Sequence, residues 1–504
     1  MKYLIIIFLT IPALILLSSF INKENENAPK SKQTEECIGC HIYINPGLVA
    51  SWEESRHAQS TPFAGLQKKA IERRISTGEI AEELKNVAVG CYECHALNTE
   101  NHADAFEHNG YEINVVVSSK DCSTCHPVEE TQYADNLMAH AYGNLMNNDV
   151  YTDFRESING NYHFSDEQLT HTEGNSETLA ESCLYCHGTK LEVTGTVLKE
   201  TDFGELEFPV IKGWPNQGVG RINTDDSKGA CTSCHPRHDF SIETARKPYT
   251  CSECHKGPDV PAYKVYEVSK HGNIFSTKKD EFNFTNVPWV LGEDFTAPTC
   301  ATCHASLIID AEGTKIADRT HQFNDRLAWR LFGVPYAHPH PIDADISKIK
   351  NKQGLPLPVE LSGEPVEEFL ITIEEQEKRN NALKNICNSC HSSSWTNSHF
   401  ARLKNTIEET NNNTITATQI LNEAWNLELA KGLPQNASIF DEKIERDWTS
   451  VWLFYANSTR FTSAMGGGGD YGVFANGRYQ LSEKIIEMNE WLKIHQKLYK
   501  KKKK

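Results

Sequence analysis

The chain has 504 residues, of which 39% are hydrophobic and 23% charged, and its formal net charge at pH 7 is −18. An acidic surface of this kind repels nucleic acid and anionic lipid, so the composition excludes both as partners. It also repels a small anion, unless a local positive site or a bound metal ion attracts that anion.

The N-terminus has the pattern of an export segment. A basic start at Lys2 precedes an apolar run that contains Pro12 and extends to Ile21, as in secretory signals. Residues 17–20 (LSSF) are a poor cleavage site, so residues 1–21 are either removed as a signal peptide or kept as an N-terminal anchor, for which the run is long enough. We therefore predict a periplasmic protein. Residues 22–34 are polar and predict a flexible linker.

Further along the chain, helical patterns outnumber strand patterns. One strand is predicted over residues 113–117, and a proline-rich and glycine-rich segment over 335–365 predicts an ordered loop or lid. Residues 411–413 (NNN) predict a loop tip between helices. Four glycines at 466–469 allow either a close backbone approach or a flexible turn. Apolar periodicity predicts helices over 66–84, 367–386, 418–430, 441–455 and 481–499.

All sixteen cysteines lie in eight Cys-x-x-Cys-His motifs. Two thiols of such a motif add to the vinyl groups of a haem and the histidine binds the iron, which is the chemistry of c-type haem attachment. A zinc protein would pair Cys-x-x-Cys units without a histidine after each, and thiol redox pairs rarely occur in eights, so we predict eight covalent haems. The motifs are Cys37, Cys40 and His41; Cys91, Cys94 and His95; Cys122, Cys125 and His126; Cys183, Cys186 and His187; Cys231, Cys234 and His235; Cys251, Cys254 and His255; Cys300, Cys303 and His304; and Cys387, Cys390 and His391.

Eight haems would supply much of the apolar core, so the hydrophobic fraction is sufficient for a chain folded around its cofactors. We predict a mainly α multihaem cytochrome c fold with little β structure. Residues 35–400 would form the octahaem domain, and residues 401–504 a C-terminal helical region that packs on it.

The histidines outside the motifs are candidate second ligands. A haem iron in an electron-transfer site binds two axial ligands, whereas a substrate-binding haem keeps one position open. An electron carrier with eight closed haems needs eight further histidines, and an enzyme with one open haem needs seven. The thirteen candidates are His57, His102, His108, His140, His163, His171, His238, His271, His321, His338, His340, His399 and His495.

The order of several short segments around the motifs resembles the octahaem hydroxylamine oxidoreductases over nearly the whole exported region. Any one of these segments is weak evidence, but their shared order around eight motifs is specific. They are SRHA at 55–58, DAFEHNG at 104–110, MAHA at 138–141, GWPNQGVGR at 213–221, CTSCHPRHDFS at 231–241, ARKP at 245–248, SKHG at 269–272, APTCATCH at 297–304, TH at 320–321 and SHF at 398–400.

The resemblance implies a homotrimer with seven haems ligated by two histidines and one open haem. The open haem of the family is the fourth, which here would be held by Cys183 and Cys186 with His187 as its sole protein ligand. The matching segments offer seven second ligands: His57, His108, His140, His238, His271, His321 and His399.

Two departures favour the reductive branch of the family. Members that oxidise hydroxylamine or hydrazine have Gly-Pro-Asp-His after the sixth motif, where this chain has Asp259 followed by Val260. The segment 332–341 (FGVPYAHPHP) is similar to that of reductive members. Oxidising members also cross-link a C-terminal tyrosine to the active haem. Tyr471 is the nearest tyrosine here, and the two departures favour the absence of a cross-link.

The resemblance therefore implies reduction of nitrite or hydroxylamine to ammonium at the fourth haem. Electrons would come from a redox partner such as a membrane quinol-oxidising cytochrome c. Asp259, Tyr336, His338 and His340 are candidate proton donors beside His187, and a protonated histidine would attract an anion.

Three alternatives stay open. His338 and His340 could belong to a proline-stiffened surface loop. The same fold could oxidise hydroxylamine or hydrazine, which a tyrosine-modified haem would indicate. The chain could also be a non-catalytic electron carrier, which an eighth second ligand such as His163 or His171 would indicate.

Overall fold

The computed structural model of the chain describes residues 28–502. The predicted export segment and the first part of the predicted linker lie outside these residues. Helix α2 (Lys32–Ile44) begins inside the predicted linker, and the hydroxyl of buried Thr34 donates to Glu93 (2.7 Å). The ordered structure therefore begins earlier than predicted. Within residues 28–502, none of the helices is long and apolar enough to span a membrane.

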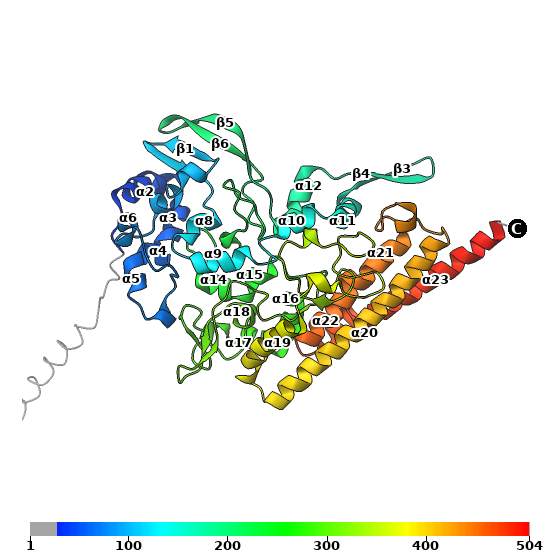
Figure 1. The fold of residues 1–504 in the computed structure, drawn as a ribbon. Helices are drawn as coiled ribbons and strands as arrows, with labels where there is room; N and C mark the ends of the chain where they lie inside the picture. Colours follow the sequence, from blue (N-terminus) through cyan, green and yellow to red (C-terminus); the bar gives the residue numbers. More distant parts are fainter. Residues whose placement is uncertain (1–27, 503–504) are drawn as a thin grey trace, which may run out of the picture.

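Short helices and loops make up the motif region, and long helices make up the C-terminal part (Figure 1). The predicted fold class, mainly α with little β structure, is confirmed. The helices up to the fourth motif are α2, α3 (Pro46–Glu53), α4 (Arg56–Gln59), α5 (Pro62–Leu66), α6 (Glu82–Lys85), α7 (Cys91–His95), α8 (Ser119–Ser123), α9 (Pro127–Ala134), α10 (Ala141–Met146), α11 (Asp149–Asn159), α12 (Ser176–Glu181) and α13 (Cys183–His187). The later helices are α14 (Ile242–Arg246), α15 (Pro248–Ser252), α16 (Ala262–Val268), α17 (Lys270–Lys278), α18 (Cys300–His304), α19 (Ile373–Asn388), α20 (Ser393–Asn426), α21 (Lys443–Thr449), α22 (Asn457–Ala464) and α23 (Arg478–Lys502).

Three of these helices coincide with haem motifs. The short helices α7, α13 and α18 each begin at the first cysteine of a motif and end at its histidine. In a helical turn, residues at positions i, i+3 and i+4 lie on the same side. One turn therefore brings both thiols and the imidazole of a motif toward the same neighbouring space.

The strands form small sheets, and the hairpins β3–β4 and β5–β6 lie at the edge of the molecule in Figure 1. Four antiparallel pairs and one three-stranded sheet, with β7 parallel to β8, are present in the described residues. The predicted strand over 113–117 overlaps only the end of β2. The strands are β1 (Ala105–His108) with β2 (Tyr111–Asn114), β3 (Asn161–Ser165) with β4 (Gln168–Thr172), β5 (Glu192–Thr201) with β6 (Gly204–Lys212), β10 (Trp329–Arg330) with β11 (His338–Pro339), and β7 (Trp289–Val290), β8 (Ile308–Ile309) and β9 (Lys315–Ala317).

The C-terminal helices form the largest side-chain core. In Figure 1, α20 and α23 lie side by side along one edge of the molecule, with α21 and α22 against them. Buried residues of α20 recur every three or four positions, as expected of a helix with one face in a core. Leu421 and Trp425 of α20 pack there with Ile444, Trp448 and Met488. The helices predicted over 441–455 and 481–499 are confirmed, with a π-helical segment (Ser450–Ala456) continuing α21.

The predicted loop tip at 411–413 is wrong, because these asparagines lie in the middle of the 34-residue helix α20. The Asn411 side chain accepts from the backbone N–H of Ala337 (3.0 Å) and from Arg460 (2.8 Å), and donates to the Ala337 carbonyl (2.9 Å). These tertiary contacts outweigh the low helix propensity of asparagine. The helix predicted over 418–430 is the last part of α20, and a domain boundary at residue 400 falls inside that helix.

The helix predicted over 66–84 is also wrong, since α5 ends at Leu66 and α6 begins only at Glu82. The backbone N–H groups of Ser76 and Thr77 donate to the carbonyl of Cys125 (3.1 and 3.2 Å), so this segment bonds to the third motif instead of to itself. The helix predicted over 367–386 corresponds to α19. The loop predicted over 335–365 has little regular structure, in agreement with its proline content.

Candidate functional site: the haem cavity

All eight motifs line one continuous cavity with a volume of about 4400 Å³. Shared among eight motifs, this is about 550 Å³ each, within the range of about 300–1,000 Å³ that is usual for cofactor pockets. None of the sixteen cysteines forms a disulfide. The space and the thiols therefore fit a covalently attached haem at the motifs.

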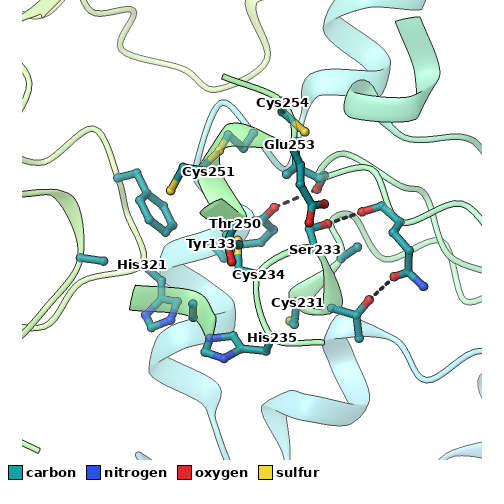
Figure 2. Close-up of a pocket in the computed structure, with 18 of the residues that line it drawn as sticks. Tyr133, Cys231, Ser233, Cys234, His235, Thr250, Cys251, Glu253, Cys254 and His321 are labelled. Atoms are coloured by element: carbon teal, nitrogen blue, oxygen red, sulfur yellow. Dashed lines mark hydrogen bonds between the residues drawn. The ribbon is translucent and has the colours of Figure 1, made fainter. Parts of the chain in front are cut away.

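Four predicted second ligands lie opposite the histidine of a motif. Two imidazoles bound to opposite sides of one metal ion, with bonds of about 2 Å, have ring centroids about 6 Å apart. Figure 2 shows one such pair, His235 of the fifth motif and His321, on the wall of the cavity. The centroid separations are 6.2 Å for His41 and His108, 6.3 Å for His126 and His57, 6.5 Å for His235 and His321, and 6.0 Å for His391 and His271.

At the second motif, His238 is the predicted ligand that lies near the motif histidine, although their rings are not at the pairing distance in the described residues. Burial, together with the neighbouring His95 and Arg237, lowers the pKa of His238 to about 4. The Nδ1 atom of His95 donates to the carbonyl of Asn114 (2.7 Å). A hydrogen bond at Nδ1 fixes the ring and leaves Nε2 free for a metal ion, so His95 is oriented as a ligand and His238 lies near it.

The structure does not bring the other two predicted ligands opposite a motif histidine. The Nε2 atom of His140 donates to the Ala134 carbonyl (3.0 Å), and His140 is absent from the lining of the cavity. His399 lines the cavity, but its ring stacks on Trp395 (5.2 Å between centroids), which in turn stacks on His391. In the described residues, neither His187 nor the motif histidines His255 and His304 has a second histidine ring at the pairing distance.

The histidines that could have closed an eighth haem lie elsewhere. His163 and His171 are exposed on the β3–β4 hairpin, which projects from the molecule in Figure 1. Neither lines the cavity. Neither His163 nor His171 is therefore placed to act as an eighth second ligand, which an electron carrier with eight closed haems would need.

Thiols of different motifs touch one another and show how the motifs are connected. A hydrogen bond with Cys231 of the fifth motif raises the pKa of Cys122 of the third. In the sixth motif, contact with Cys300 raises the pKa of Cys251, and contact with Cys186 raises the pKa of Cys254. The sixth motif is thus the neighbour of both the fourth and the seventh.

The fourth motif is held tightly at both ends. Asn159 of α11 lies against Cys183 (3.8 Å from Nδ2 to Sγ), and Nδ1 of His187 donates to the Ala141 carbonyl (3.2 Å). Directly after His187, Gly188 has φ +89°, and a Cβ there would lie 2.3 Å from the backbone nitrogen of Arg221. Only glycine fits this turn. The ring of His187 is therefore fixed with Nε2 free.

Charged groups, not a second ligand, surround His187. Burial lowers its pKa, an effect that nearby Asp259 opposes and Arg330 increases. Asp259 is exposed and lines the cavity, and its backbone carbonyl accepts from Asn457 (3.2 Å). The carboxyl group of Asp259 is thus accessible from the cavity, and its proton-donor role stays a prediction.

The loop that carries the other predicted donors is only partly in contact with the cavity. The hydroxyl of fully buried Tyr336 donates to the Leu361 carbonyl (2.7 Å) and lies 2.9 Å from Thr418. Tyr336 thus ties the loop to α20 and does not face the cavity, contrary to its predicted role. His338 is also absent from the lining, whereas His340 belongs to it.

Burial also changes the charge predicted for these histidines. Burial lowers the pKa of His338 to about 3, and burial together with Arg330 lowers the pKa of His340 well below its usual range. Both shifts favour neutral rings, so they do not support the prediction that a protonated histidine attracts an anion at His338 or His340. The positive group is Arg330, which has no sequence signal beyond a lone arginine in an apolar strand.

The glycine run at 466–469 lines the cavity, and all four residues have positive φ. Its conformation requires glycine. A Cβ added at Gly466, Gly467 or Gly469 would meet nothing within 4 Å, and only at Gly468 would it meet Thr462 (2.7 Å), so the run approaches protein atoms closely at one position. Tyr471, the tyrosine considered for a cross-link, begins a π-helical segment (Tyr471–Ala475) and is not part of the cavity lining.

Comparison with known proteins places these observations in a family. Residues 216–330 match the family "Seven times multi-haem cytochrome CxxCH", and residues 36–118 match "Cytochrome c554 and c-prime". A solved structure called "Hypothetical multiheme protein" is 40% identical, with a TM-score of 0.87 over 94% of this chain and 98% of that chain. These matches support covalently bound c-type haems in this chain.

Two relatives from Kuenenia stuttgartiensis are more distant. A "Probable nitrite reductase-hydroxylamine oxidoreductase fusion protein" is 26% identical over 383 residues, which are 71% of this chain but 34% of that protein. The chain thus spans about a third of the length of this relative. A "reducing HAO-like protein complex" has the same fold, at 17% identity, with a TM-score of 0.62 over 94% of this chain and 87% of that one. The motifs, the two family matches and the 40% identity to a multihaem protein over nearly the whole of both chains together show that the chain belongs to the multihaem cytochromes c.

Proposed function

We propose that this protein is a periplasmic octahaem reductase that converts nitrite, hydroxylamine or both to ammonium at the fourth motif. The observation that carries the proposal is the surroundings of His187. Its ring is fixed through Nδ1, and an acid and a cation lie nearby. No second histidine ring lies opposite it among the described residues, a property that it shares with His255 and His304. The printed name of the Kuenenia fusion protein, which includes nitrite reductase, supports the choice of substrate.

The chain's own residues would perform three tasks at this site. A haem attached to Cys183 and Cys186 would supply an iron with an open position, able to bind a nitrogen oxide and pass electrons to it. Asp259 would deliver protons from its exposed carboxyl group, and a positioned general acid typically contributes about 10²–10⁴-fold to the rate. His340, neutral and on the cavity wall, would relay protons. The glycine run and the Tyr336 contact would hold the surrounding backbone in place.

The remaining motifs would supply electrons. The sixth motif touches the fourth through Cys254 and Cys186, and the seventh through Cys251 and Cys300. Electrons would therefore enter the fourth site by way of the sixth. We propose a redox partner such as a membrane quinol-oxidising cytochrome c as their source, and a homotrimer as the working assembly.

The proposal is tested with the purified holoprotein, whose intact mass should exceed that of the polypeptide by eight haems. With reduced viologen as donor, ¹⁵N-nitrite or ¹⁵N-hydroxylamine should yield ¹⁵N-ammonium. His187→Ala should abolish ammonium formation and leave most of the haem spectrum intact. His41→Ala, which alters the first motif in the same way, is the matched control and should retain most of the activity.

Two results would overturn the proposal. Equal loss of activity in the two variants would mean that the fourth motif has no special role. Absence of ammonium from the parent, together with reduction of an artificial acceptor by hydroxylamine, would assign the protein to oxidation instead.

A further inference from the structure

Arg330 is a partly buried cation that no acidic side chain neutralises among the described residues. It lies in β10, opposite His338 of β11. Among the described residues its side chain has no hydrogen bond and no ion pair, and its guanidinium carbon lies 5.6 Å from the ring centre of Phe332. Buried arginines elsewhere in the chain do bond to protein groups. Arg326 donates to backbone carbonyls, and Arg460 to Asn411 and Asn457.

The Arg330 side chain is accessible from the haem cavity. It lines that cavity. Its guanidinium nitrogens have no hydrogen-bond partner among the described residues, but they are not fully shielded from solvent. Burial lowers the pKa of Arg330, but a guanidinium remains protonated in proteins. A cation kept in a region of low dielectric attracts an anion far more strongly than a surface arginine does. A haem propionate in this cavity or an anion from outside would satisfy Arg330, and the experiment below distinguishes the two.

Tyr151 is the second unsatisfied group at this place. Its hydroxyl has no hydrogen-bond partner among the described residues, yet it is not sealed in the core, and Tyr151 lines the cavity. Arg330 and Tyr151 influence each other electrostatically. Burial raises the pKa of Tyr151, so the phenol keeps its proton and can donate a hydrogen bond.

Both groups belong to the surroundings of the fourth motif. Tyr151 lies near the start of α11, and Asn159 at the end of the same helix contacts Cys183. Arg330 is close enough to His187 to lower its pKa. Hydrogen bonds link these groups as well. Arg155 bonds to the Tyr151 carbonyl and to Met146 of α10, and the carbonyl of Ala141 in α10 accepts from His187. Asn457 accepts from the backbone N–H of Gly333, three residues after Arg330, and donates to the Asp259 carbonyl.

We propose that the Arg330 guanidinium and the Tyr151 hydroxyl bind the oxygen atoms of a small oxyanion, nitrite in particular, beside the fourth motif. This inference rests on the proposed function and names what determines its substrate. The planar guanidinium can donate two parallel hydrogen bonds to the two oxygens of such an anion. It would also overcome the repulsion from a chain of net charge −18. Hydroxylamine is neutral, so the guanidinium would attract it much less than it attracts an anion. Arg330 would therefore favour nitrite over hydroxylamine.

The test compares Arg330→Gln with Arg155→Gln in the oxidised holoprotein. Arg155 also lines the cavity, but its guanidinium bonds to the Tyr151 carbonyl, to Met146 and to Thr152. Calorimetric titration with sodium nitrite, without any electron donor, measures binding. We expect Arg330→Gln to weaken nitrite binding about 10- to 100-fold, the scale of a lost charge-assisted hydrogen bond. Arg155→Gln should bind nitrite like the parent, and Tyr151→Phe should bind it less tightly.

Turnover gives the specificity. In Arg330→Gln, the ratio of kcat/KM for nitrite to kcat/KM for hydroxylamine should fall about 10-fold or more. An equal fall for both substrates, with a shifted haem midpoint potential, would assign Arg330 to neutralising a haem propionate and overturn the inference. Unchanged nitrite binding in both Arg330→Gln and Tyr151→Phe would overturn it as well. If Arg330→Gln loses haem, the Arg330→Lys variant is used in its place. The inference is then overturned if both Arg330→Lys and Tyr151→Phe bind nitrite as tightly as the parent.

The two proposals can fail separately. If the parent binds nitrite through Arg330 but forms no ammonium, the proposed reduction is wrong and the anion site stands. If the parent forms ammonium and the variants bind nitrite normally, the reduction stands and the anion site is wrong.

Discussion

His235 and His321 lie with ring centroids 6.5 Å apart and ring planes inclined by 28°, although they come from distant parts of the chain. This arrangement suits the two axial ligands of one iron. Replacing His321 by alanine should therefore open one haem and leave the others as they are, which optical and EPR spectra would detect as one new high-spin haem per chain. His171→Ala, on the exposed β3–β4 hairpin, should leave the spectrum unchanged. A parent-like spectrum for His321→Ala would remove His321 from the ligands.

His338 and His340 should differ in effect, because only His340 lines the cavity. We expect His340→Ala to lower nitrite turnover by roughly 10²-fold, the scale of a lost proton-transfer group, with all haems retained. His338→Ala should affect stability more than turnover, since its ring is 1% exposed and its Nδ1 donates to the Pro339 carbonyl (2.6 Å). Steady-state kinetics and haem content measure both. Equal turnover in the two variants would contradict this distinction, and loss of haem from His340→Ala would make His340 an axial ligand.

Asp259 should be the main proton donor. Asp259→Asn removes the acid with little change of shape, and turnover should fall by roughly 10²-fold or more. Asp259→Glu keeps the acid and serves as the control, with most of the turnover restored. If the asparagine variant works at the parent rate across the pH range, protons reach the fourth motif by another route.

The motifs, the fold class and several ligand pairs could be predicted because their signals are local or ordered along the chain. A Cys-x-x-Cys-His motif needs only one turn of backbone, as α7, α13 and α18 show. His57, His108, His271 and His321 stand in segments whose order matched a family, and each lies opposite a motif histidine.

Other features depend on tertiary contacts that leave no mark in the sequence. Asn411 lies in a helix because Ala337 and Arg460 satisfy its side chain. Tyr336 was expected at the site, but its hydroxyl finds partners on the other side of the loop. Arg330 and Tyr151 lie far apart in sequence, and only the fold brings them to the same wall of the cavity.

A buried histidine outside the cavity should control stability at high pH. His102 lies 3.3 Å from Asp104 and 3.1 Å from Asp121, with all three side chains almost fully buried. Burial by itself lowers the pKa of His102, but hydrogen bonds to Asp104 and Asp121 outweigh it and raise the pKa to about 10. A raised pKa stabilises the folded state fully below the unfolded value of about 6.5, and this stability is lost as the pH rises toward 10.

His102→Gln should therefore destabilise the protein most near neutral pH, by about 3–5 kcal/mol, because it leaves two buried carboxylates without their cation. The difference between the denaturation midpoints of variant and parent should shrink as the pH rises from 7 to 10. His171→Gln, at an exposed position, is the control. A difference that stays constant over this interval would show that His102 is not charged in the folded protein.

The account's central claim is that the chain keeps one open haem position, at the fourth motif. The most direct measurement is titration of the fully reduced, fully haem-loaded protein with carbon monoxide, which binds only where an axial position is free. We predict saturation at about one carbon monoxide per chain, with nitrite competing for the same position in the oxidised protein. No binding would mean that every haem has two ligands and that the protein is an electron carrier. Binding of more than one would mean that further haems are open, and the first candidates are those at His255 and His304, which have no second histidine ring at the pairing distance among the described residues.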